Sequence, residues 1–352
     1  RPRDLDHRRA SGLCAQCHGE LVLKDNFSEF EPGKDLLDYA HVLEYLPEAP
    51  PAWLKEAIVD EPRILQDSFW RDGTIRIAGR DFNGLVKTGC YTAGEMSCIT
   101  CHAMHGSDRN DQLKASAKGD AVCVECHADI GRAVEAHTHH DADSSGSHCY
   151  NCHMPHTTVG LLGLIRAHRV DSPNANVTQR TGRPNACNLC HLKKSLTDVA
   201  DNLSAWYGHA PLAGPDPAPD MSYILDQLLR GDAVQRATAA WHMSWTPAMK
   251  ASGDDWQAPY LAELLDDPYS AIRAIAGESL KKLPTFSDFN YDYVGNKADQ
   301  EAGRKKANDH WAQTTATLEN EAAILLTAQG VDRNRVTQLK SQRDDRPIRV
   351  NE

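Results

Sequence analysis

The chain has few aromatic residues and no long hydrophobic run. Aromatic side chains make up 7% of its 352 residues, and hydrophobic residues of all kinds make up 41%. No stretch of 18 consecutive apolar residues occurs, so we expect no membrane-spanning helix. This composition is lean for a large conventional hydrophobic core.

Positive charge is also in deficit. The 49 acidic residues outnumber the 38 basic ones, and the formal net charge is −11. An acidic surface disfavours binding to nucleic acid or to an anionic membrane and favours basic or neutral protein partners. The length predicts two or three domains.

Cysteine and histidine are abundant, with 11 and 17 copies, and ten of the cysteines fall in one repeated phrase, Cys-x-x-Cys-His. The phrase is the attachment signature of c-type haem: both thiols bond to one porphyrin, and the histidine binds its iron. We therefore predict five covalently bound haems c. The paired cysteines are Cys14 and Cys17, Cys98 and Cys101, Cys123 and Cys126, Cys149 and Cys152, and Cys187 and Cys190. The histidines that follow them are His18, His102, His127, His153 and His191.

Two other interpretations of paired cysteines are weaker. The second and third pairs are separated by 21 residues, a spacing similar to that of zinc sites. Zinc would not require a histidine after every second cysteine, yet all five pairs have one. A thioredoxin-like redox motif requires a βαβ context, which is absent. The remaining cysteine, Cys90, is expected to be a buried structural thiol.

Each haem iron has a second axial position, and twelve histidines lie outside the five phrases. His105 follows the second phrase closely and could reach a neighbouring haem. His137 and His140 belong to a run with three imidazoles, and His168 follows an apolar stretch. Because histidine is so plentiful, we expect mostly bis-histidine haems rather than ligation by Met96, Met104 or Met154.

The first 97 residues have a single haem phrase and are expected to contain some regular structure. The spacing of apolar residues predicts a helix over 35–46, with His41 in it, and a second helix after Pro51. Asp72-Gly73 between alternating residues predicts a small hairpin. Between the second and fifth phrases there is room for turns and short helices but little for a sheet.

The C-terminal part has a different character. After a predicted helix over 196–206, four prolines in 211–220 indicate a stiff linker. Beyond it, 231–240 and 267–276 are similar to each other, with their arginines 37 residues apart, and each follows another helical segment, 222–229 and 258–265. This pattern resembles HEAT-type repeats. The segment 295–328 is expected to form a helical cap, and 343–347 a loose tail or a strap.

We therefore expect a mainly α protein: a pentahaem cytochrome c domain over 1–210 with little regular structure, a linker over 211–220, and a HEAT-like helical domain over 221–352.

The sequence resembles the extracytoplasmic multihaem cytochromes c that are fused to C-terminal helical repeats. The resemblance rests on 98–106, on the His137-x-x-His140 pair before a CxxCHMP phrase, on 167–170 and on 183–191, and it covers most of 85–207. It implies that His105, His137, His140 and His168 are distal ligands. For the first haem we choose His41, with His156 as the next candidate. Family members are mostly electron carriers or subunits of redox complexes.

The leading hypothesis is an electron-transfer protein whose five haems relay electrons between redox partners, which could be other proteins or copies of this chain. Haem attachment to paired thiols takes place outside the cytoplasm, so we expect a periplasmic or extracellular protein whose targeting segment has been removed. One alternative is a multihaem oxidoreductase with one open-site haem that acts on a small nitrogen or sulfur compound. Another is a subunit of a cytochrome filament or complex.

Overall fold

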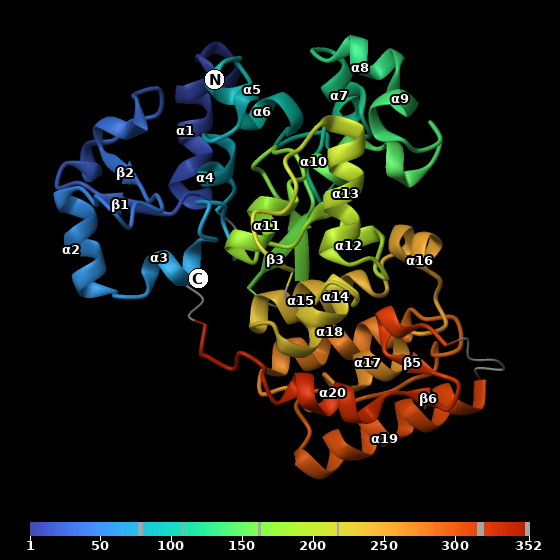
Figure 1. The fold of residues 1–352 in the computed structure, drawn as a ribbon. Coiled ribbons are helices and arrows are strands. Elements are labelled where there is room, and N and C mark those ends of the chain that lie inside the picture. Colours follow the sequence, from blue (N-terminus) through green and yellow to red (C-terminus); the bar gives the residue numbers. More distant parts are fainter. Residues whose placement is uncertain (77–79, 108, 161–162, 217, 315–319, 349–352) are drawn as a thin grey trace. The chain divides into compact units, whose positions relative to one another are not determined.

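The computed structural model describes residues 1–76, 80–107, 109–160, 163–216, 218–314 and 320–348. Over these ranges the protein is mainly helical, as predicted, and its strands form two-stranded sheets that pair β1 with β2, β3 with β4 and β5 with β6 (Figure 1). No helix in the described part of the chain is long and apolar enough to span a bilayer.

The chain divides into two units by its internal contacts. The first comprises 1–156 and 166–172 and contains four of the five Cys-x-x-Cys-His phrases; the second comprises 157–165 and 173–352 and contains the fifth. The proline-rich stretch predicted as a linker lies inside the second unit, where Asn176 donates to the carbonyl of Pro211 over 3.0 Å. Separate folding of domains on either side of 211–220 stays a prediction.

The first unit is built from short helices and one small sheet. Its elements are η1 (Pro2–Asp4), α1 (His7–His18), β1 (Leu21–Leu23), η2 (Phe27–Glu29), η3 (Leu36–Asp38), β2 (Ala40–Val42), α2 (Ala52–Asp60), α3 (Ile64–Ser68), α4 (Asp81–Leu85), α5 (Gly89–Thr92), α6 (Cys98–Cys101), η4 (Ala115–Ala117), α7 (Ala121–Val124), α8 (Ala128–Arg132), α9 (Val134–Thr138), η5 (Ser145–Ser147) and α10 (Cys149–His153).

The prediction of a helix over 35–46 is wrong. The segment forms the single 3-10 turn η3 and then strand β2, which pairs antiparallel with β1 so that Val22 lies opposite His41. The Asp35 side chain caps only the first turn by accepting the N–H of Leu37. The helical interpretation placed Leu37 on the buried face, yet it is 49% exposed. The backbone of 40–42 is instead hydrogen-bonded to β1. This pairing is a long-range interaction, so the local spacing of apolar residues does not indicate it.

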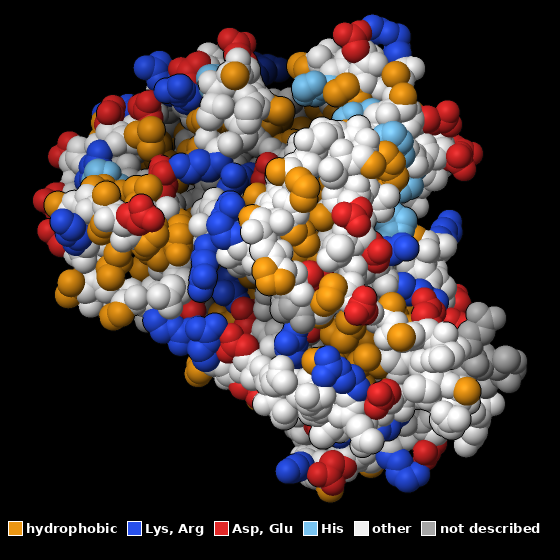
Figure 2. Space-filling view, in the orientation of Figure 1, with side chains coloured by type: hydrophobic (Ala, Val, Ile, Leu, Met, Phe, Trp, Pro, Cys, Tyr) orange, Lys and Arg blue, Asp and Glu red, His pale blue; other side chains and the backbone are white. Residues whose placement is uncertain are grey.

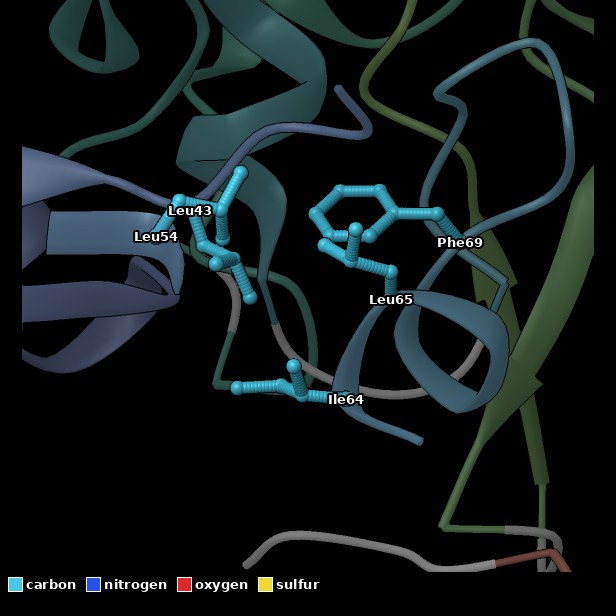
Figure 3. Close-up of a cluster of buried hydrophobic side chains, with 5 residues drawn as sticks. All are labelled: Leu43, Leu54, Ile64, Leu65 and Phe69. Atoms are coloured by element: carbon cyan, nitrogen blue, oxygen red, sulfur yellow. The ribbon is translucent and has the colours of Figure 1, made fainter. Parts of the chain in front are cut away.

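The other predictions for this region are confirmed. Helix α2 begins directly after Pro51, and Phe69 and Ile75 form an antiparallel bridge around the turn at Gly73, which has a φ of +77°. These segments enclose a small hydrophobic cluster (Figure 3). Its buried members are Leu43, Leu54, Ile64, Leu65 and Phe69.

The second unit contains most of the longer helices. Its elements, with the hairpin that enters it from the first unit, are β3 (His156–Val159), β4 (Gly163–Arg166), α11 (Ala175–Thr181), α12 (Ala186–Cys190), α13 (Leu196–Tyr207), α14 (Tyr223–Arg230), α15 (Ala233–His242), α16 (Thr246–Ser252), α17 (Ala258–Ala262), α18 (Ser270–Lys281), α19 (Lys297–Thr314), η6 (Ala322–Ile324), β5 (Leu326–Thr327), β6 (Gly330–Val331) and α20 (Arg333–Lys340).

Most of the helices predicted for this half are present. Helix α13 matches the prediction over 196–206, and α14, α15, α17 and α18 match the four repeat segments. Helix α14 packs on α15, α15 on α18, and α17 on α18. The predicted cap is helical only in α19; after the undescribed residues 315–319 the chain continues as η6 and the β5–β6 hairpin.

A buried arginine connects helix α15 to the C-terminal segment. Arg236 is fully buried, and its guanidinium binds the carboxylate of Asp267 at 2.8 Å and the carbonyls of Gly231 and Asp344 at 2.7 and 3.0 Å. Its counterpart Arg273 binds backbone carbonyls, among them that of Asp267 at 2.6 Å. The segment after α20 is thus held by Arg236. Of the two predictions for 343–347, a loose tail or a strap, the structure shows the strap.

Replacing Arg236 with alanine should strongly destabilise the second unit, because buried Asp267 would lose its closest partner charge and keep only the more distant guanidinium of Arg343, at 3.6 Å. We expect a loss of about 3–5 kcal/mol in the free energy of unfolding, measured by urea denaturation followed by circular dichroism. R273A is the matched control and should cost about 1–2 kcal/mol, since it removes only bonds to carbonyls. Equal losses for the two variants would contradict the importance of the buried ion pair.

Candidate haem-binding sites

In four of the five phrases a short helical segment contains both cysteines and delivers the histidine at or just after its end; in the third, α7 ends at Val124 and Cys126 lies in the turn that follows. His18 and His153 are the last residues of α1 and α10, and His102 and His191 follow α6 and α12. Local side chains cap three of these helices, among them α1, where the Asp6 carboxylate accepts the N–H groups of Arg8 and Arg9. Ser97 and Thr100 form a capping box before α6, and Asn185 accepts the N–H of Cys187 at 3.0 Å. Three-residue spacing places both thiols on one side of such a turn.

The first and second Cys-x-x-Cys-His motifs contact each other in the same way as the third and fourth. In each pair, a side chain before one motif accepts the backbone N–H of the first cysteine of the other. The hydroxyl of Ser11 accepts the N–H of Cys98 at 3.4 Å, and the carboxylate of Asp120 accepts the N–H of Cys149 at 2.8 Å. Ser11 and Asp120 each lie three residues before the first cysteine of their own motif. The first cysteines of each pair are hydrogen-bonded to each other: Cys14 to Cys98, and Cys123 to Cys149.

These contacts make the thiols of the unattached chain unequal. A hydrogen bond from Cys98 lowers the pKa of Cys14 to about 6, and the same bond raises the pKa of Cys98. In the other pair, burial raises the pKa of Cys123, and burial together with the nearby charge of Asp120 raises that of Cys149 to about 12. Cys14 is therefore the thiol of these four that ionises most readily before attachment.

Two pairs of imidazoles face each other at a distance that suits one iron between them. The ring centroids of His102 and His168 lie 6.1 Å apart, and those of His137 and His153 lie 6.2 Å apart. With metal–nitrogen bonds of about 2 Å, two imidazoles on opposite sides of one metal have centroids roughly 6 Å apart. Each pair combines a motif histidine with one that the sequence analysis chose as a distal ligand.

Hydrogen bonds and contacts at Nδ1 leave Nε2 for the metal. The Nδ1–H of His102 donates to the carbonyl of Asp111 at 2.9 Å, and that of His153 to the carbonyl of Asp171 at 3.0 Å. The Nδ1 of His168 lies 2.8 Å from a carboxylate oxygen of Asp81. Second contacts of this kind fix the tautomer of a ligating histidine.

The electrostatics of these rings also suit metal binding. Burial lowers the pKa of both His102 and His137 below the ordinary histidine value. They are therefore neutral at neutral pH, as a metal ligand must be. Paired thiols, opposed imidazoles and fixed tautomers together fit a c-type haem, which would supply the redox-active iron.

Close backbone packing positions His168. A Cβ atom at Gly84 in α4 would lie 2.7 Å from the Arg169 nitrogen and 3.0 Å from the His168 carbonyl carbon. Any other residue at this place would push 168–169 away from α4. Glycine is therefore required for the contact between Asp81, at the start of the same helix, and His168.

The other predicted distal histidines have different surroundings. The Nδ1–H of His140 donates to the carbonyl of Thr138 at 2.6 Å, and its ring lies against Gly146, where a side chain would collide with it. His41 stacks on Trp53 with ring centroids 4.6 Å apart, and His105 is exposed. None of these three is shown opposite a motif histidine by the contacts described above.

In Figure 2, histidine side chains gather over the region of α7–α9.

Two histidines that the sequence analysis counted but did not choose have features of ligands. His148 has its Nδ1 2.9 Å from Asp120, which leaves its Nε2 for a metal. His209 has a buried Nδ1 with no hydrogen-bond partner in the described structure and lies in the second unit, as the fifth motif does. The position of His148 directly before Cys149 could have indicated a ligand from the sequence alone. For His209 no such signal exists, and only the fold shows that its Nδ1 is buried.

The fifth motif is integrated into the second unit. The hydroxyl of Ser252, at the end of α16, accepts the N–H of Leu192 and donates to the carbonyl of Cys190, both at 2.8 Å. Asn188 donates to the carbonyl of Lys194 at 3.0 Å.

Cys90, in the first unit, is half-buried rather than buried as predicted.

Substituting Gly84 with alanine should displace His168 and convert one haem of the oxidised protein from low spin to high spin. The matched control is G89A, at a glycine where an added Cβ meets nothing within 4 Å. Electron paramagnetic resonance of both variants measures the effect. A G84A spectrum identical to that of G89A would contradict the role of close packing in placing His168.

The comparisons with known proteins agree with this chemistry. Residues 91–132 match the family model of the doubled CXXCH motif, which spans the second and third motifs. No curated protein and no solved structure matches the chain. The doubled motif indicates covalent binding of haem c, and the chain is consistent with a multihaem cytochrome.

Proposed function

We propose that this chain is an electron-transfer protein that carries five haems c, mostly with bis-histidine ligation. The observation that carries the proposal is the pairing of His102 with His168 and of His137 with His153 at about 6 Å. Each pair would hold one iron from both faces. The remaining motifs have the same residues and the same local helical turn, so the attachment chemistry is the same at all five.

Two-sided ligation favours electron transfer over catalysis. An iron with an imidazole on each face has no open position for a substrate, and two histidines keep its potential low. Histidines whose Nδ1 is held by Asp111, Asp171 or Asp81 need little rearrangement when the iron changes charge. The sites described thus suit repeated oxidation and reduction.

The contacts between motifs support transfer within the chain. Because Cys14 contacts Cys98, and Cys123 contacts Cys149, haems attached to these cysteines would lie next to each other in two pairs. Electrons pass within each pair and then leave for a redox partner. The net charge of −11 favours a partner with a basic or neutral docking surface.

The helical half gives the protein a surface for such a partner. We place α14–α15 and α17–α18 as two HEAT-like repeats, in which Arg236 and Arg273 occupy equivalent positions and bind carbonyls of the turn before their own helix. Stacked helix pairs offer extended docking surfaces to another protein or to another copy of the chain. Since c-type cytochromes are generally periplasmic or extracellular, we place this protein there as well.

The proposal is tested by counting the haems and determining their spin states. Pyridine haemochrome analysis should give five haems per chain, and electron paramagnetic resonance of the oxidised protein should show low-spin ferric signals. The double variant C98A/C101A should bind four haems, whereas the control C90A should still bind five. Fewer than five haems in the wild type would refute the count, and a substantial high-spin signal would favour an open-site enzyme.

A further inference from the structure

Asp81 contacts histidines that belong to two different haem sites. It is the first residue of α4, and its side chain is 26% exposed. One carboxylate oxygen lies 2.8 Å from the Nδ1 of His168, and the other lies 3.5 Å from the Nδ1 of His18. His18 is the motif histidine of the first site, and His168 faces His102 of the second.

Helix α4 is held in place by contacts that involve neither imidazole ring. The buried side chain of Asn83 accepts the N–H of Glu20 at 2.7 Å and donates to the carbonyl of Leu43 at 2.9 Å. Gly84 packs against the backbone of 168–169. The position of the carboxylate is thus imposed by the surrounding framework, so it orients the imidazoles rather than following them.

The charge at Asp81 sets its contacts apart from those of His102 and His153. The Nδ1 atoms of His102 and His153 are bound by neutral backbone carbonyls. At Asp81, by contrast, a carboxylate lies beside the Nδ1 atoms of both His168 and His18. A carboxylate beside Nδ1 makes the imidazole a stronger donor than a carbonyl does, and a stronger donor stabilises ferric over ferrous iron.

We propose that Asp81 is a positioning residue shared by two haem sites, which orients His18 and His168 with Nε2 toward their irons and lowers both reduction potentials together. This inference rests on the proposed function, since it requires haems at the first and second motifs. The two motifs are also the pair joined through Cys14 and Cys98. A common carboxylate keeps the potentials of these adjoining haems close, so electrons can pass between them in either direction.

The test is a potentiometric titration of D81N, followed by visible absorption and by electron paramagnetic resonance. Asparagine keeps the size of the side chain and removes its charge. We expect two of the five potentials to rise, and the low-spin signals of the same two haems to change, while the other three stay at their wild-type values. The matched control is D129N, which removes the same charge from a side chain that is 93% exposed.

Each other result counts against the inference. A shift at only one haem, no shift, or a uniform shift equal to that of D129N would overturn the shared role. If D81N loses haem, D81E must restore five haems and near-wild-type potentials, because it keeps the charge; equal defects in the two variants would also overturn the inference. A wild-type protein without low-spin haems at these motifs would instead refute the proposed function.

Discussion

The proposed haem sites depend most on holding two imidazoles with their ring centroids about 6 Å apart, and the Nδ1 atoms of His102 and His153 are hydrogen-bonded to backbone carbonyls. This arrangement needs rigid contacts, because the rings come from short helices and loops that have little stability of their own. The bonds from His102 and His153 to backbone carbonyls and the contact of His168 with Asp81 supply that rigidity. The packing of α4 through Asn83 and Gly84 serves the same purpose at a distance from the rings.

The two units differ in how many side chains they bury. The second has a dense core in which Leu225, Val234 and Tyr260 are fully buried and Arg236 pairs with Asp267. In the first, the helices α7, α8 and α9 have no buried residues. In the function proposed here, covalently attached haems supply the apolar surface that these helices lack. The low aromatic content of the chain is consistent with this division.

Sequence reasoning succeeded where the relevant interactions are local. The helices α13, α14 and α15 have side-chain caps and apolar spacing that can be read from adjacent residues, and α18 has the apolar spacing alone. It failed at 35–46, where pairing with β1 outweighs the helical spacing, and for Cys90, whose exposure depends on its neighbours in space. His168 and His137 were chosen from their surroundings in the sequence, but their partners His102 and His153 were not identified.

The sequence by itself determined the attachment chemistry, because the two thiols and the first axial histidine of each haem lie within five consecutive residues. Only the tertiary structure decided which second histidine faces the second and fourth motifs, which motifs adjoin, and that one carboxylate lies beside histidines of two sites. These features join residues far apart in the chain, such as His18, Asp81 and His168, through helix and backbone packing. Their spacing in sequence carries no information about such contacts, since each depends on how several segments fold together.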